Sequence, residues 1–139
     1  MHETCNYKKD IVMSIHNYAF IIMHLIELIY GGMSIHDCLE PAIVSTVISV
    51  LGLLFNIRGV YVLIFSHKIQ CNDVLVQCII HCTNIAAQSS ILGLLNEDDV
   101  GECLYSYKLQ EIATVLILFN VLMIFVNIII YIYEVKSDN

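Results

Sequence analysis

Two polar patterns within otherwise apolar stretches of the chain could carry chemistry. His24 and Glu27 stand one helical turn apart and share a face with Asn17, so an imidazole and a carboxylate are placed where they could share a proton. A second face carries amide and imidazole groups at positions i, i+4, i+7 and i+11, namely Gln77, His81, Asn84 and Gln88. Such groups are costly against lipid, so we expect both faces to point toward protein.

These polar faces have two interpretations. As structural elements they would hold helices together, since interhelical hydrogen bonds in membranes are worth about 0.6 kcal/mol each. As functional elements they would line a path for a proton, an ion or a small solute. Acidic pairs and basic rings at matching depths are absent from the sequence, which favours the structural interpretation.

A Cys-x-x-His-Cys cluster has a spacing that resembles a metal site. It is formed by Cys78, His81 and Cys82, and no second cluster of His and Cys lies at the same depth. Zinc needs four ligands, or three ligands and a water. The sequence also contains no nucleophile-elbow, zinc-protease or phosphate-loop motif. We therefore predict no metal, no cofactor and no catalytic residues.

The elements that must position these side chains are four long apolar stretches. The chain has 139 residues, of which 58% are hydrophobic and 14% charged, and its formal net charge is −7. This composition excludes disorder and provides no basic surface for nucleic acid. A bilayer-spanning helix needs about 20 apolar residues. The stretches that qualify are 11–31, 42–66, 74–95 and 109–133.

The predicted fold is all-α: a single transmembrane domain over residues 1–139, in which four helices form a bundle in the membrane. A soluble helical bundle is the alternative. It is disfavoured because the run 121–133 has no polar outer face apart from Asn127.

The distribution of basic residues predicts that both termini are cytoplasmic. Lys8, Lys9, Lys68 and Lys136 lie in the two tails and the second connection. The first connection has no Lys or Arg, and the third is acidic with only Lys108 at its end. A cleaved signal peptide is the alternative for the first stretch, but that stretch is too long and no small-residue cleavage site follows it.

Stripes of small or polar residues predict how the helices pack. The second stretch carries Ser45, Ser49, Gly52, Asn56 and Gly59 on one continuous line, a spacing that lets another backbone approach closely. The fourth carries Ala113, Asn120, Asn127 and Glu134, each seven residues apart. We expect a compact bundle with left-handed crossings near 20°.

Two charged side chains inside the predicted spans need partners. Arg58 either extends toward the inner headgroups, which we favour, or meets His81 and Asn127 at similar depth. For Glu27, besides His24, the best-placed neighbours are Glu111 on the fourth span and Ser45 or Thr46 on the second.

The cysteines outside the apolar interior fall into two sets. Cys38 and Cys103 lie in the two outer connections, on the oxidising side, so we expect either a disulfide between them or two free thiols. Cys5 and Cys71 lie close to the membrane on the cytoplasmic side and are candidates for palmitoylation.

Part of the chain resembles small tetraspan membrane proteins. The residues that carry the likeness are Leu53–Val60, then Ser66-His67-Lys68, and the ending Ile130–Lys136. The chain is most similar to a group of small arthropod four-span proteins that includes the Pasiflora proteins of insect septate junctions, within the MARVEL-like and claudin-like class. It lacks Trp, so the W-x-x-W signature of claudins is absent. The resemblance implies a membrane-organising or junctional role.

The function predicted from these observations is non-enzymatic. We expect an integral membrane protein, most readily of the plasma membrane and alternatively of an endomembrane. Its partners would be the lipid bilayer and other membrane proteins or further copies of itself, as in a junction or an accessory subunit. The alternative is a small transporter or channel component with a polar intramembrane path. A continuous polar cavity would favour transport, and a packed interior would favour association.

Overall fold

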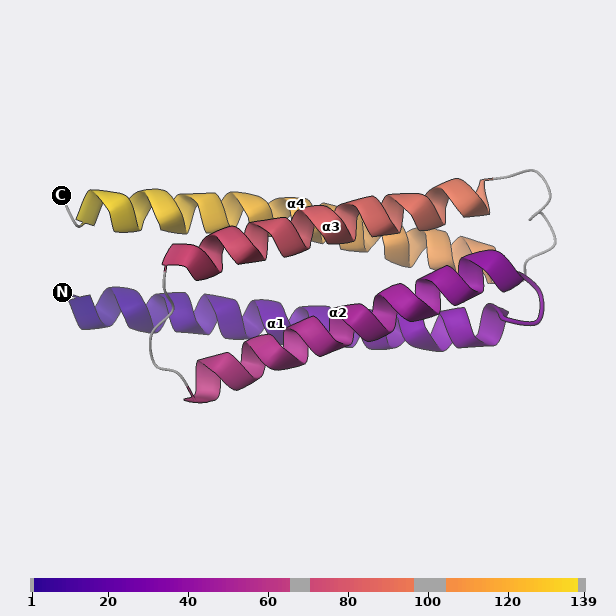
Figure 1. The fold of residues 1–139 in the computed structure, drawn as a ribbon, viewed down its shortest axis with the longest axis horizontal. Coiled ribbons are helices and arrows are strands. Elements are labelled where there is room, and N and C mark those ends of the chain that lie inside the picture. Colours follow the sequence, from indigo (N-terminus) through magenta and orange to yellow (C-terminus); the bar gives the residue numbers. More distant parts are fainter. Residues whose placement is uncertain (1, 66–70, 97–104, 138–139) are drawn as a thin grey trace.

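The computed structural model is a bundle of four long helices (Figure 1). They are α1 (His2–Ser34), α2 (Leu39–Phe65), α3 (Cys71–Leu95) and α4 (Ser106–Ser137). The structure describes residues 2–65, 71–96 and 105–137, and within these ranges it describes all side chains except those at 2–13, 62–63, 65, 71–74, 134–135 and 137. The all-α fold class is confirmed. Each predicted apolar stretch lies in its own helix, except that residue 66, the last of the stretch 42–66, is outside the described residues. The helices begin three to nine residues earlier than the stretches.

The bundle consists of two helical hairpins. α1 packs mainly on α2, and α3 packs mainly on α4, while contacts between the hairpins are fewer. α1 begins and α4 ends at the same end of the bundle, here called the terminal end (Figure 1). The α1–α2 turn lies at the opposite end, here called the loop end, together with the end of α3 and the start of α4.

The α1–α2 turn spans residues 35–38, which is shorter than the segment 32–41 that separates the predicted apolar stretches. Hydrogen bonds from the Asp37 and Cys38 amides to the Ser34 carbonyl, 3.1 and 2.8 Å long, close α1, and the Cys38 carbonyl accepts the amide of Ala42 at 3.0 Å in the first turn of α2. Pro41 fits there because the first turn of a helix does not need its amide. The turn therefore leaves no room for a separate outer domain between the two helices.

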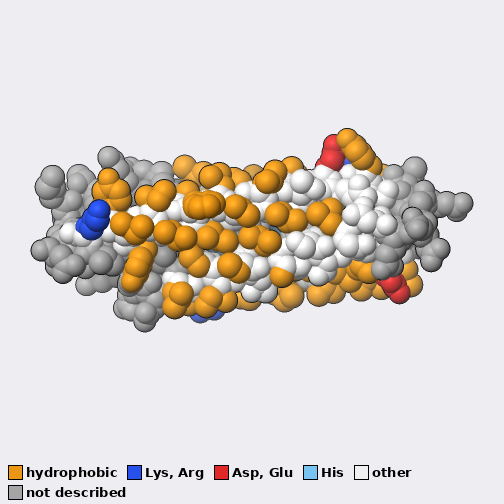
Figure 2. Space-filling model, turned by 90° about the horizontal axis from the view of Figure 1, so that it is seen from above, with side chains coloured by type: hydrophobic (Ala, Val, Ile, Leu, Met, Phe, Trp, Pro, Cys, Tyr) orange, Lys and Arg blue, Asp and Glu red, His pale blue; other side chains and the backbone are white. Residues whose placement is uncertain are grey.

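The outer surface of the bundle is apolar. Three described helical segments, Leu39–Tyr61, Leu75–Leu95 and Ser106–Tyr133, are long and apolar enough to cross a membrane. Figure 2 shows hydrophobic side chains along the length of one face, with acidic side chains near the loop end. Large hydrophobic side chains are exposed on all four helices, as at Ile22, Leu54, Ile79 and Phe125. Contiguous exposed apolar surface of this kind is typical of a protein that contacts lipid or a partner.

Polar side chains on the outside of α3 explain why its sequence is the least apolar of the three segments. The hydroxyls of Thr83, Ser89 and Ser90 are exposed, and each donates to the backbone carbonyl four residues earlier, at 2.8–3.0 Å. A hydroxyl that is bonded within its own helix leaves no unpaired donor against lipid.

Two apolar clusters fill parts of the interior. The loop-end cluster consists of Ile91, Leu95, Leu109 and Ala113, with Tyr30 and Val44 among the side chains packed on it. The second cluster consists of Phe20, Leu116 and Met123, which join α1 to α4. The polar side chains occupy the space that these clusters leave.

Candidate functional site: a buried polar column

Hydrogen-bonded polar side chains from α1, α3 and α4 form a column inside the bundle. His24 Nδ1 lies 3.0 Å from Glu27 Oε2, and His24 Nε2 lies 3.5 Å from the amide nitrogen of Asn84. That amide nitrogen also donates to Asn120 Oδ1 at 3.4 Å, and His81 Nδ1 lies 2.7 Å from the same oxygen. We call Glu27, His24, Asn84, Asn120 and His81 the polar column.

The bonds of the polar column set the proton positions on its imidazoles. Asn120 uses its amide nitrogen to donate to the Leu116 carbonyl at 2.7 Å, so its Oδ1 is an acceptor and His81 Nδ1 carries a hydrogen. The Asn84 amide donates toward His24 Nε2, so His24 Nδ1 carries the hydrogen that Glu27 Oε2 accepts. His24 and Glu27 are 0% and 1% exposed, so this bond is completely enclosed.

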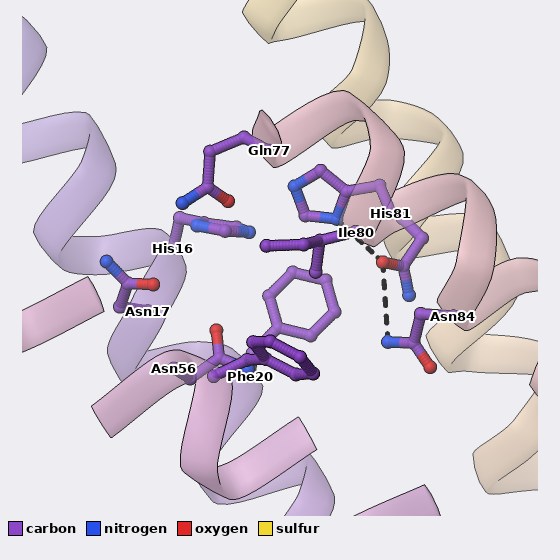
Figure 3. A pocket seen from close by; sticks show the side chains of 10 residues that line it. His16, Asn17, Phe20, Asn56, Gln77, Ile80, His81 and Asn84 are labelled. Carbon is purple, nitrogen blue, oxygen red and sulfur yellow. Dashed lines mark hydrogen bonds between the residues drawn. The ribbon is translucent and has the colours of Figure 1, made fainter. Parts of the chain in front are cut away.

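A small cavity adjoins the polar column on the side of the terminal end. Its volume is about 20 Å³, enough for about one water molecule. Side chains from all four helices line it, and Figure 3 shows His16 and Gln77 facing it from one side and Asn17 and Asn56 from another. His81 and Asn84 connect the cavity to the polar column.

Several polar atoms around the column are buried without a partner among the described residues. They include both ring nitrogens of His16, Nε2 of His81 and Oε1 of Glu27. The rings of His16 and His81 meet edge to face with centroids 4.9 Å apart. Buried ring nitrogens normally have a hydrogen-bond partner, and the adjoining cavity is large enough for a water that could bond to both rings.

The stripe on α2 lies against α1. A Cβ at Gly52 would collide with the ring of His24, and a Cβ at Gly59 would stand 2.7 Å from the Oδ1 of Asn17. Ser45 and Ser49 are fully buried, and the Ser49 hydroxyl donates to the Ser45 carbonyl at 2.7 Å. The stripe Ser45–Gly59 is therefore occupied by intramolecular packing.

Most of the polar residues singled out in the sequence point inward. Asn17, His24, Glu27, His81, Gln88, Asn120 and Asn127 are buried, and Gln77 and Asn84 are partly buried. On α4 the stripe residues Ala113, Asn120 and Asn127 are all buried. The side chain of Glu134 is outside the described part of the chain.

The two charged side chains inside the predicted spans lie apart from the neighbours considered on other helices. Arg58 is exposed, so the structure does not show the alternative in which it meets the buried His81 and Asn127, and the favoured extension toward the headgroups stays a prediction. Glu111 is also exposed, and its Oε2 accepts a hydrogen bond from Lys108 at 3.0 Å. Glu27 pairs with His24 of its own helix, the neighbour that the one-turn spacing in the sequence indicated.

The cysteines differ in placement. Cys78 is partly buried and Cys82 is exposed, whereas His81 between them is buried, so the three side chains diverge. In the described residues no three His, Cys, Asp or Glu side chains converge on a metal position. Cys38 is buried, and Cys103 lies outside the described residues, so the disulfide stays a prediction. The side chains of Cys5 and Cys71 also lie outside them.

His16 lines the cavity and was not among the candidate residues taken from the sequence. It lies eight residues before His24 and eleven before Glu27, a spacing that puts it on the same face of α1 and could have indicated it. Phe20 was missed as well, although its ring packs on His16, His81 and Phe119 and holds the column together.

No protein-family model, curated protein or solved structure matches this chain. Chemically, the column can hold protons and water within a bundle whose exterior is apolar.

Proposed function

We propose that the chain is a four-span integral membrane protein with cytoplasmic termini that acts, without catalysis, by associating with other membrane proteins or with further copies of itself. The observation that carries this proposal is Arg58, a charged side chain on the outer surface of a membrane-spanning segment. Such residues are rare against lipid and are usually paired or functional.

Arg58 lies on an exposed face of α2 that is otherwise apolar. Leu51, Leu54 and Tyr61 are exposed on the same side of the helix, at one-turn and two-turn spacing from it. We call these four residues the Arg58 face. Among the described residues Arg58 has no ion-pair partner. A second helix that presents a carboxylate or its carbonyl end at this depth would satisfy the guanidinium.

The filled interior supports association over transport. Apolar clusters and the polar column occupy the centre of the bundle, and the cavity beside His81 has room for about one water, at about 20 Å³. A solute larger than water does not fit there. The small-residue stripe of α2 packs against α1, so it is not available to a partner. A partner must therefore bind the outer surface, where the Arg58 face lies.

Charge supports the proposed orientation. Arg58 and Lys136 belong to the half of the bundle with the terminal end, and Asp37 and Glu40 belong to the loop end, where Lys108 is paired with Glu111. Basic residues favour the cytoplasmic side. The proposed location is the plasma membrane, or alternatively an endomembrane.

The experiment compares complexes extracted in mild detergent from the native membrane. The wild-type chain of 15.8 kDa should migrate in a complex larger than a monomer in its micelle. Arg58→Leu should lose the partner, and Arg58→Lys should retain part of it because the charge remains. Ile57→Leu, on the exposed neighbouring position, is the matched control and should behave as the wild type. A monomer in every case, or an Arg58→Leu complex equal to that of the wild type, refutes the proposal.

A further inference from the structure

At Glu27, the polar column contains a buried acceptor that has no donor among the described residues. His24 Nδ1 carries a hydrogen and donates it to Glu27 Oε2, and His24 Nε2 accepts from Asn84. His24 is therefore neutral in this arrangement. Glu27 Oε1 has no hydrogen-bond partner among the described residues and is buried. An ionised Glu27 would be a charge in the interior of the bundle with a single hydrogen bond.

No cation in the surrounding elements compensates such a charge. The buried stripe of α2 offers Ser45, Ser49 and Gly52, which do not ionise. α3 offers Asn84 and Gln88, with His81 farther along the column, and α1 adds His16 beyond it. On α4 the nearest polar group is Asn120, and the Lys108 ammonium is exposed and paired with Glu111. A buried carboxylate without a cation is strongly disfavoured.

We propose that Glu27 is an occluded proton-binding site: Oε1 holds the proton while Oε2 accepts the hydrogen bond from His24. One proton added to Oε1 makes the pair neutral and leaves every bond of the column as the structure has it. A proton on His24 Nε2 instead would place two donors, Nε2–H and the Asn84 amide, against each other at 3.5 Å. The ligand of the site is a single proton.

The cavity beside His81 gives the site its route of exchange. Glu27 lies eleven residues from His16 on α1, which is about 16 Å along the helix axis. The column runs from Glu27 to His81, whose ring contacts that of His16, and the ring nitrogens of His16 and Nε2 of His81 that lack partners adjoin the cavity. On the other side, the buried core of the loop-end cluster, Ile91, Leu95, Leu109 and Ala113, is apolar, and Tyr30 packs on it. The Asn84 and Asn120 amides do not relay protons, so a water that enters from the cavity must carry the proton between His24 and the terminal end.

Infrared spectroscopy of the full chain in lipid nanodiscs tests the site. The wild type should show the C=O stretch of a protonated carboxyl at neutral pH, and Glu27→Gln should lose it. Glu111→Gln, which removes an exposed and ion-paired carboxylate, is the matched control and should keep the band. Isotopically labelled glutamate in the wild type should shift the band, which serves as a second measurement if Glu27→Gln fails to fold. Equal spectra for the wild type and Glu27→Gln, or no shift on labelling, overturn the proposal.

The route is tested by the rate at which the band shifts after transfer into heavy water. Filling the cavity with Asn56→Leu should slow the shift by about tenfold, whereas Ser89→Leu on the outer surface of α3 should leave it unchanged. An unchanged rate in Asn56→Leu refutes this route. In vesicles, a steady proton leak in the wild type that Glu27→Gln removes would refute the occlusion of the site.

Discussion

The imidazole of His24 on α1 lies directly over Gly52 of α2, so closely that a methyl group at position 52 would stand 2.5 Å from its Cε1 and 2.6 Å from its Cδ2. Real side chains do not approach that closely, so only glycine fits. The contact fixes the distance between α1 and α2 at the depth of the His24–Glu27 bond. Helix spacing and the geometry of the polar column are thus set by the same residue.

Gly52→Ala is expected to destabilise the bundle by roughly 1–3 kcal/mol, the usual cost of overpacking. His24 must turn away or α1 must move, and either change breaks its bond to Glu27. Gly93→Ala is the matched control, because a Cβ there meets no atom within 4 Å. It should be neutral or stabilising by about 0.5–1 kcal/mol through helix propensity. Reversible unfolding in mixed micelles measures both, and equal effects of the two substitutions would contradict the packing argument.

The hydrogen bond between His81 and Asn120 links α3 to α4 at 2.7 Å and is expected to show measurable coupling. In a double-mutant cycle with His81→Ala and Asn120→Ala, the coupling energy should be about 0.6–1.7 kcal/mol, the range for interhelical bonds in membranes. A parallel cycle of His81→Ala with Ser89→Ala should give no coupling, since Ser89 bonds only to its own helix. Zero coupling in the first cycle would show that the bond does not stabilise the fold.

The sequence was sufficient to predict four helices and the inward face of each. Periodicity predicts burial well when polar groups recur at helical spacing in an apolar segment, because lipid excludes them from the outside. The pairing of His24 with Glu27 was predictable, because the two residues stand one turn apart on the same helix face. The pairs between helices, such as His81 with Asn120, were not, because the spacing within one helix does not say which residue of another helix lies opposite. Arg58 is exposed, and its sequence position, off the line of the α2 stripe, is compatible with this.

Cys38 and Cys103 are expected to form the disulfide that ties the α1–α2 turn to the connection between α3 and α4. Cys78 and Cys82 have free thiols and act as an internal reference. After denaturation without reductant, a maleimide should modify Cys78 and Cys82 but neither Cys38 nor Cys103. Reductant before denaturation should make all four reactive. Full modification of Cys38 and Cys103 without reductant would refute the bridge.

Cys38→Ser gives the corresponding energetic test. If the disulfide closes the loop through α2 and α3, its removal should lower the free energy of unfolding by about 2–5 kcal/mol. The measurement uses the same micelle titration, and Cys82→Ser, at an exposed position, should have little effect. A Cys38→Ser variant as stable as Cys82→Ser would contradict the prediction.

α1 is expected to cross the membrane as a fourth span, although its average hydropathy is lowered by its polar groups. Those groups, among them His16, His24 and Glu27, are buried against the other helices, while Ile15, Ile22 and Ile29 on its outer face are 58–63% exposed. The lipid would therefore contact only the apolar face of α1. Its long contact with α2 also requires the two helices to occupy the same depth. Protease is given access only to the cytoplasmic side of otherwise sealed membranes. Epitope tags at the two ends of the chain should then both be cleaved, and a tag in the α1–α2 turn, at His36, should be protected. Protection of the N-terminal tag alone would place α1 outside the bilayer or reverse its orientation, and the bundle would then have three spans.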